Sequence, residues 1–240
     1  MNYFLKKEKN LEFFLFNNFN PKNLIYGFTT KIWDLKEIIK NFNLRENSIV
    51  SLRQIHSDKF HIITNKPKKL LVGDALITQK RELLLTIRTA DCLPILFYDN
   101  EKEIIGAIHS GWKGTSKRIT YKVLKETINL FNLNPSSLIV LLGPCICERC
   151  YDVGEDVKKA FENHKEWKNL NFLTYSQKDK KYKLDLRKAN LIQICEAGIK
   201  DENIFSINLC TKCNPDLFYS HRRDPKNKGR MLAFIGLKNY

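Results

Sequence analysis

The chain has 240 residues, 43% of them hydrophobic, which is enough for a substantial core in one domain of ordinary size. No apolar run is long enough to cross a bilayer, and residues 1–19 lack the apolar core of a signal peptide. The net charge of +15 is typical of proteins with anionic partners. The lysines, however, are spread along the chain without stacking aromatics between them. We therefore expect one cytoplasmic domain over residues 1–240, with neither a membrane nor a specific nucleic acid as its partner.

The expected elements follow from apolar runs and their spacing. Strands are predicted at 83–87, 95–98, 104–109, 138–142, 204–209 and 231–237. Helices are predicted at 115–131, 153–161 and 186–197. Strands predominate and do not alternate regularly with helices, so we expect an α+β fold with a mixed sheet. No Gly-x-Gly-x-x-Gly follows the first strand, which argues against a Rossmann fold.

Two histidines and one cysteine lie near predicted strand ends: His56, Cys92 and His109. Two imidazoles and a thiolate form a three-ligand set that leaves a fourth tetrahedral position open, as in catalytic zinc sites. A thiolate also selects zinc or copper(I) over magnesium or calcium. Each residue taken alone has a structural alternative: a hydrogen-bonding histidine, a small buried Cys92, and a helix entry after His109.

Short motifs in a fixed order point to one family. They occupy residues 53–57, 73–78, 89–94, 107–114, 143–146, 151–154, 210–214 and 218–224. In this order they closely resemble the YfiH/PgeF family, which is also catalogued as polyphenol oxidase or laccase domain. The resemblance implies a single domain with central mixed β-sheets covered by helices, similar to a cysteine-hydrolase fold. It also implies that His56, Cys92 and His109 bind the metal, which we expect to be zinc.

The resemblance further implies purine nucleoside chemistry. The expected reactions are phosphorolysis of adenosine, inosine and methylthioadenosine to free base and sugar 1-phosphate, together with adenosine deamination. Zinc lowers the pKa of its bound water, and the resulting hydroxide can attack C6 of adenine. Copper at the same site would give weak oxidase activity. The five histidines of the chain are too few for a multicopper oxidase.

Polar residues beside the ligands are candidates to orient them or to move protons. Gln54, Asp74 and Asp91 are the nearest in sequence. Asp91 adjoins Cys92, so it is the first choice for a catalytic carboxylate that transfers a proton. An equal alternative is that Asp91 only caps a turn.

Phosphorolysis also needs a cationic seat for phosphate, and arginine binds phosphate through two hydrogen bonds. The residues expected to bind substrate or phosphate are Arg222, Arg223, Arg230, Gln54 and Lys31. Lys31 stands where the family usually has an arginine, so two-point anion binding is lost there. The alternative for the arginines is a surface cluster that pairs with Asp224.

Two C-x-x-C pairs, Cys147 with Cys150 and Cys210 with Cys213, have the spacing of a four-thiolate zinc site. The gap between the pairs is far longer than in a zinc ribbon, and the first pair lacks a glycine-rich knuckle. We interpret these residues as buried or semi-buried thiols, with a second zinc as the alternative. Cys195 lies on an apolar helix face and is predicted to be in the core.

Two further functions compete with the nucleoside enzyme. The resemblance also implies an alternative in which Cys92 is the nucleophile of a hydrolase or amidase, activated by His109 or His56. The family's second name implies that such an enzyme would act in the editing of peptidoglycan precursors. A basic nucleic-acid-binding module is the alternative without enzymatic activity. Activity that survives complete chelation would favour the hydrolase, and phosphate-dependent turnover of nucleosides would favour the phosphorylase.

Overall fold

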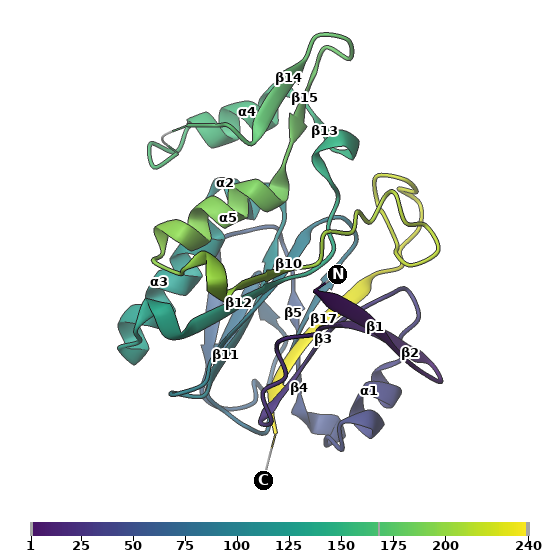
Figure 1. Ribbon diagram of the computed structural model, residues 1–240, viewed down its shortest axis with the longest axis vertical. Helices are drawn as coiled ribbons and strands as arrows, with labels where there is room; N and C mark the ends of the chain where they lie inside the picture. The colour runs from purple at the N-terminus through teal and green to yellow at the C-terminus, as the bar shows by residue number, and fades with distance from the viewer. Residues whose placement is uncertain (1, 168, 239–240) are drawn as a thin grey trace.

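The computed structural model describes residues 2–167 and 169–238. Two six-stranded sheets pack face to face at the centre of the molecule (Figure 1). In order across the first sheet, the strands are β1 (Tyr3–Glu8), β2 (Leu11–Phe16), β3 (Leu24–Thr29), β17 (Met231–Leu237), β9 (Leu84–Thr89) and β4 (Ile49–Val50). Across the second they are β16 (Ile204–Ser206), β12 (Leu138–Leu142), β10 (Leu93–Asp99), β11 (Ile104–Ser110), β8 (Ala75–Thr78) and β6 (Phe60–Ile63). Both sheets are mixed, because β4 joins β9, β16 joins β12 and β6 joins β8 in parallel while the other pairs are antiparallel.

Smaller elements complete the fold. A third sheet consists of β13 (Asp152–Val153), β15 (Lys181–Leu184) and β14 (Leu173–Ser176), and β5 (Leu52–Arg53) pairs with β7 (Leu71–Val72). The α-helices are α1 (Leu35–Asn41), α2 (Trp112–Ser116), α3 (Ile119–Phe131), α4 (Glu155–Glu162) and α5 (Leu186–Glu196). The 3-10 helices are η1 (Glu46–Ser48), η2 (Pro135–Ser137), η3 (Glu148–Cys150) and η4 (Asp201–Asn203).

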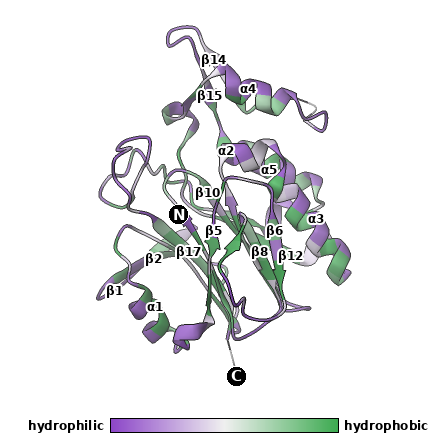
Figure 2. Ribbon diagram, turned by 180° about the vertical axis from the view of Figure 1, so that it is seen from behind, coloured by the Kyte–Doolittle hydropathy of each residue, from purple (hydrophilic) through white to green (hydrophobic). Residues whose placement is uncertain are grey.

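The central strands are apolar throughout because both of their faces are covered. Along β10, Ile95 and Phe97 point to the core beneath the helices, while Leu96 and Tyr98 point to the core between the two sheets. Helices α2, α3 and α5 cover the outer face of the second sheet, and α1 covers the first (Figure 1). In Figure 2 the central strands are largely hydrophobic, whereas the loop that joins β14 to β15 is hydrophilic.

The α+β class with mixed sheets is confirmed. All nine predicted elements are present: the strands at 138–142 and 231–237 have the predicted ends, and the other elements have shifted ends. The helix expected over 115–131 is two helices, because Arg118 adopts a left-handed conformation (φ 63°) between α2 and α3. The prediction for Cys195 was wrong: its side chain is exposed, and its Sγ lies 3.5 Å from Asp201 Oδ1. Within residues 2–167 and 169–238, no helix combines the length and apolar character that crossing a membrane requires.

Candidate active site

A pocket of about 710 Å³ lies where strand ends of both central sheets meet. The residues after β5 and β9, those before β10, and those at the end of β11 and the start of α2 all contribute to its lining. The segment 207–230, which joins β16 to β17, forms another wall with His221, Arg222 and Arg230. The volume is in the range of small-molecule sites, about 300–1,000 Å³.

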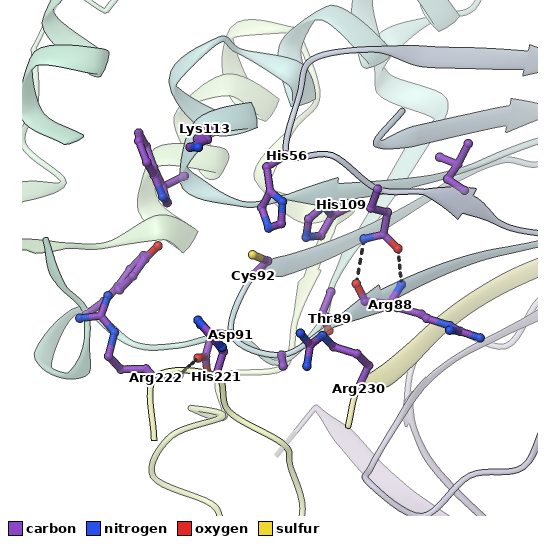
Figure 3. Close-up of a pocket in the computed structure, with 15 residues that line it drawn as sticks. His56, Arg88, Thr89, Asp91, Cys92, His109, Lys113, His221, Arg222 and Arg230 are labelled. Atoms are coloured by element: carbon purple, nitrogen blue, oxygen red, sulfur yellow. Dashed lines mark hydrogen bonds between the residues drawn. The ribbon is translucent and has the colours of Figure 1, made fainter. Parts of the chain in front are cut away.

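His56, Cys92 and His109 come together in this pocket, as expected. Their ligand atoms all lie within 4.8 Å of one another, and the two imidazole rings are 4.8 Å apart at 76°. Figure 3 shows the Cys92 sulfur beside the two rings. The donor set and its spacing fit a single zinc ion, which takes histidine nitrogen and cysteine sulfur at about 2.0–2.3 Å. Copper also binds histidine nitrogen and cysteine sulfur, but only these ligand types, and not the geometry of the site, favour it.

Asp74 holds both histidines. Its fully buried carboxylate lies 2.8 Å from His109 Nδ1 and accepts the backbone N–H of His56 at 3.0 Å. Its other oxygen accepts the N–H and the hydroxyl of Ser57, each at 2.7 Å. Because His109 Nδ1 donates to Asp74, Nε2 is the nitrogen left to face the pocket. Asp74, named with Asp91 and Gln54 in the sequence, is therefore the carboxylate that orients the ligands.

Local backbone geometry is also specific at this site. His56 has a φ of 57°, a left-handed conformation that costs free energy for a residue other than glycine. The hydrogen bonds to Asp74 offset that cost. Gly111, just after β11, leaves room for the ligands, since a Cβ there would lie 2.9 Å from Cys92 Sγ and 3.0 Å from His56 Cδ2.

The ionisation of Cys92 and His109 is coupled. Burial alone would raise the pKa of Cys92, but the charge on His109 and hydrogen bonds from both histidines lower it to about 6. Burial disfavours protonated His109, yet the Cys92 thiolate and Asp74 raise its pKa to about 9. Burial opposes the charge of Asp74 as well, but hydrogen bonds from His109 and Ser57 lower its pKa to about 2.

Asp91 lines the pocket and also links distant segments. Its two carboxylate oxygens accept the Thr211 hydroxyl at 2.6 Å and the Arg222 N–H at 2.7 Å. Its φ is 90°, so the turn before Cys92 is held in a strained conformation. These contacts match the turn-capping alternative, and the proton-transfer role of Asp91 stays a prediction.

Cationic residues also line the cavity. Arg222 and Arg230, which were expected to bind phosphate, contribute to the lining, as does Lys113. Arg88 lines it as well, but in Figure 3 its side chain runs away from Cys92 and the two histidines, and its guanidinium lies 5.9 Å from the Trp33 ring centre. Arg222 lies 5.1 Å from the Tyr151 ring centre and donates to Asp152 O at 2.7 Å. Among the described residues of the lining, the carboxylate of Asp91 is the one acidic group. The cavity is therefore suited to an anion.

Arg223 and Lys31 lie outside the pocket lining. The Arg223 guanidinium donates to the carbonyls of Thr211, Lys212 and Phe218 at 2.9, 3.0 and 2.6 Å. Lys31 Nζ donates to Pro215 O at 3.1 Å. Both residues fix the backbone of segment 207–230, so the structure gives no support to their predicted contact with phosphate.

Gln54 lines the pocket, but its amide is engaged. Its Nε2 donates to Arg88 O at 2.8 Å, and its Oε1 accepts the Arg88 N–H at 2.9 Å (Figure 3). This pairing fastens the loop that carries His56 to the end of β9.

The sequence analysis missed several lining residues, including Arg88, Trp112, Lys113 and Tyr151. Arg88 left a signal: it is the one exposed residue of the otherwise buried strand β9. Arg88 is a charged residue inside an apolar run, shortly before Cys92 in the sequence. Such a residue indicates a side chain that must reach solvent or a ligand. Burial raises the pKa of the Tyr151 phenol, so the ring is neutral at this wall.

Comparisons with known proteins give the family. The sequence profile of a family described as "Multi-copper polyphenol oxidoreductase laccase" matches residues 33–238. The chain belongs to this laccase-domain family, the YfiH/PgeF family. Its YfiH-like fold is similar to the crystal structure of the hypothetical protein YfiH of Bacillus licheniformis, with a TM-score of 0.88 and 28% identity over 98% of this chain and 99% of that one.

Proteins similar to this chain carry a functional name. The purine nucleoside phosphorylase YlmD of Bacillus subtilis is 32% identical over 255 residues, which cover 92% of this chain and 91% of that protein. A purine nucleoside phosphorylase of Clostridium acetobutylicum is 39% identical over 197 residues, covering 81% and 78%. The crystal structure of YlmD from Geobacillus stearothermophilus superposes with a TM-score of 0.86 at 25% identity, over 98% and 99% of the two chains.

Proposed function

We propose that this protein is a zinc-dependent purine nucleoside phosphorylase. One observation carries the proposal: a single pocket combines the His56, Cys92 and His109 ligand set with the cationic side chains of Lys113, Arg222 and Arg230. The names of the relatives that span most of the chain support the same activity. The proposal includes a cytoplasmic location and one catalytic domain over residues 1–240, as expected from the sequence.

The chain's own residues suit phosphorolysis. The reaction joins a phosphate oxygen to C1′ of ribose, breaks the bond from C1′ to the purine nitrogen, and returns a proton to the purine. Arg222 and Arg230 would hold the phosphate oxygens and neutralise their charge. The aromatic rings of Trp112 and Tyr151 in the lining offer apolar faces for a purine. Bound zinc would act as a Lewis acid or lower the pKa of a water molecule.

Adenosine deamination is the second activity that we propose for the same pocket. The three-ligand set leaves a fourth position open, which a hydrolytic zinc site requires. Asp91 is the carboxylate of the lining that could pass a proton to the departing ammonia. Inosine would be the product.

One geometric feature favours the hydrolase alternative. Asp74, His109 and Cys92 follow one another in the order of a catalytic triad, with the carboxylate 2.8 Å from His109 Nδ1. The same residues serve equally well as two zinc ligands and the carboxylate that orients one of them. Metal dependence separates the two functions, because zinc occupies the thiolate that a cysteine nucleophile needs free.

The test uses the purified full-length protein with measured metal content. We expect inosine to be converted to hypoxanthine and ribose 1-phosphate only when phosphate is added. Removal of zinc should abolish this conversion, and stoichiometric zinc should restore it. Conversion that continues after complete chelation would overturn the metal-dependent proposal and favour a cysteine hydrolase.

A further inference from the structure

Four cysteines form a second cluster that shares no member with the His56, Cys92 and His109 set. The four-cysteine cluster consists of Cys147, Cys150, Cys210 and Cys213, whose Sγ atoms all lie within 4.8 Å of one another. The two pairs are far apart in the sequence, and the fold brings them together. Neither the phosphorolysis proposed above nor the pocket lining uses any of the four.

Backbone turns present each pair on one side. The 3-10 helix η3 closes with a hydrogen bond from the Cys150 N–H to Cys147 O at 3.0 Å, and residues three apart share a face in such a turn. In the second pair, both the N–H and the side-chain amide of Asn214 donate to Cys210 O, at 3.2 and 2.8 Å. Cys210 and Cys213 are thereby also held on one side of a turn.

The two turns are joined directly. Cys145 and Cys210 form an isolated parallel bridge, in which the Thr211 N–H donates to Cys145 O at 3.2 Å. The Cys147 N–H also donates to Cys210 Sγ at 3.3 Å. Backbone N–H groups that point at cysteine sulfur stabilise a thiolate and are frequent around metal-bound thiolates.

The sulfur spacing fits one ion. Cys150 Sγ and Cys213 Sγ are 3.4 Å apart, far beyond the S–S bond length of about 2.05 Å. Four sulfurs at about 2.3 Å from a tetrahedral zinc ion stand about 3.8 Å from one another, close to the observed separations. Cys210 is buried and Cys213 exposed, so the cluster has a route from solvent through Cys213.

We propose that Cys147, Cys150, Cys210 and Cys213 bind one zinc ion as a structural site. Four thiolates fill the tetrahedral coordination and leave no position for substrate, which is the arrangement of structural rather than catalytic zinc. Soft sulfur ligands in this geometry select zinc over the hard cations magnesium and calcium.

The site would fix one wall of the pocket. Segment 207–230, all of it described by the structure, contains no helix or strand beyond the bridge at Cys210, and such long irregular loops need tertiary anchors. It carries Arg222 and Arg230, while Tyr151 directly follows Cys150. A zinc ion in the four-cysteine cluster would therefore fix the positions of Arg222 and Tyr151 relative to each other.

Zinc stoichiometry of the full-length protein tests the proposal without any measurement of turnover. The total count rests on the proposed function for one of the two ions, but the ion lost in Cys213→Ser is counted separately from the ion lost in Cys92→Ser, so failure of either proposal can be told apart. We expect two zinc ions per wild-type chain, one in Cys92→Ser, one in Cys213→Ser, and none in the double variant. Cys195→Ser is the matched control, because Cys195 is exposed and outside the cluster; it should keep both ions.

A rescue variant covers the case in which Cys213→Ser folds poorly. Cys213→His replaces sulfur with nitrogen and gives a three-cysteine, one-histidine set that zinc also accepts, so this variant should keep the second ion. Cobalt added to metal-free wild-type protein should give the intense thiolate-to-cobalt absorption of a four-sulfur site. A wild-type protein that holds only the zinc lost in Cys92→Ser, or a disulfide between cluster cysteines in freshly reduced protein, would overturn the proposal.

Discussion

The buried carboxylate of Asp74 contacts the loop of His56 and the ring of His109 at the same time. A negatively charged acceptor in this position keeps Nδ1 of His109 protonated and compensates the left-handed backbone at His56. The charge and shape of the ligand set therefore depend on a residue that does not itself line the pocket.

Replacement of Asp74 by asparagine should weaken metal binding more than it weakens the fold. The amide cannot accept all of the hydrogen bonds that now converge on the carboxylate, so the imidazoles lose their fixed orientation. Outer-sphere substitutions of this kind lower metal affinity by about 10–100-fold. Competition with a zinc chelator measures the change. Ser57→Ala, which removes only one bond to Asp74, is the control, and equal affinities for Asp74→Asn and wild type would contradict the prediction.

Arg222 and Arg223 are adjacent in sequence but are expected to behave differently. Arg222→Ala removes a cation from the pocket and should raise the KM for phosphate by about 10–150-fold, since a hydrogen bond to a charged group contributes about 1.5–3 kcal/mol. Arg223→Ala instead leaves three carbonyls without their donor and should lower the free energy of unfolding by about 1–3 kcal/mol. Steady-state kinetics and urea denaturation distinguish them. A matching effect of both changes on phosphate KM would remove the special role of Arg222.

Asp91→Asn separates the two proposed reactions. If Asp91 relays the proton, deamination of adenosine should fall by about 10²–10⁴-fold, the usual contribution of general acid–base catalysis. Phosphorolysis depends more on phosphate placement and should fall less. Both products are measured on protein with confirmed zinc content. Unchanged inosine formation would show that Asp91 serves only to anchor Thr211 and Arg222.

At the scale of elements, strand register explains why the position of Asp74 could not be derived from the sequence. Asp74 directly precedes β8, and β8 pairs with β11 so that Ala75 lies opposite Ile108. The His109 N–H then donates to Asp74 O at 2.7 Å. The apolar patterns revealed β11 but gave no indication of its neighbour, so Asp91, adjacent in the chain to Cys92, ranked ahead of Asp74.

The break between α2 and α3 is another feature that local pattern did not show. Apolar spacing continues across it, but Arg118 turns the chain there and is itself buried. Its guanidinium donates to Glu166 O at 2.9 Å, forms an ion pair with Glu196, and lies 4.5 Å from the Tyr121 ring centre. Glu166 and Glu196 lie far along the sequence from Arg118, which is why helical periodicity alone predicted one continuous helix.

Arg118→Lys should therefore destabilise the protein even though the charge is kept. A lysine cannot reproduce the planar fork that contacts Glu166, Glu196 and the aromatic ring together. We expect the free energy of unfolding to fall by about 1–3 kcal/mol, measured by urea denaturation. Lys117→Arg, at the neighbouring exposed position, is the control and should change little. An unchanged midpoint for Arg118→Lys would refute this account of the break.

For the whole molecule, the apolar strands of the sequence indicated a core covered by helices but not the pairing of two sheets. Strands β4 to β8 have only two to four residues each, so their patterns were too weak to predict, and the six-residue strands β1 to β3 were not predicted either. The core between the sheets combines residues from both ends of the chain, such as Phe28, Leu96 and Ile235. The motif resemblance implied central mixed sheets covered by helices, but it did not imply which strands form each sheet or that the two sheets share a core.

Stability should depend strongly on this inter-sheet core. Ile235 is fully buried on β17, so Ile235→Ala should lower the free energy of unfolding by about 2–5 kcal/mol through lost burial and a cavity. Leu70→Ala is the matched control, because Leu70 is 63% exposed and should change stability little. Chemical denaturation of zinc-loaded protein measures both. Equal stabilities would mean that the two sheets can repack around the lost side chain.

The position of β17 also affects how the protein is made. This strand, near the end of the sequence, inserts between β3 and β9, which come from the first half of the chain. Until the ribosome has released residues 231–237, β3 and β9 have no strand between them, and their backbone edges stay open. Arg230 enters the pocket only with that last strand. During most of its synthesis the nascent chain therefore contains an incomplete first sheet with exposed apolar strands. This is the stage at which a chaperone would be most useful.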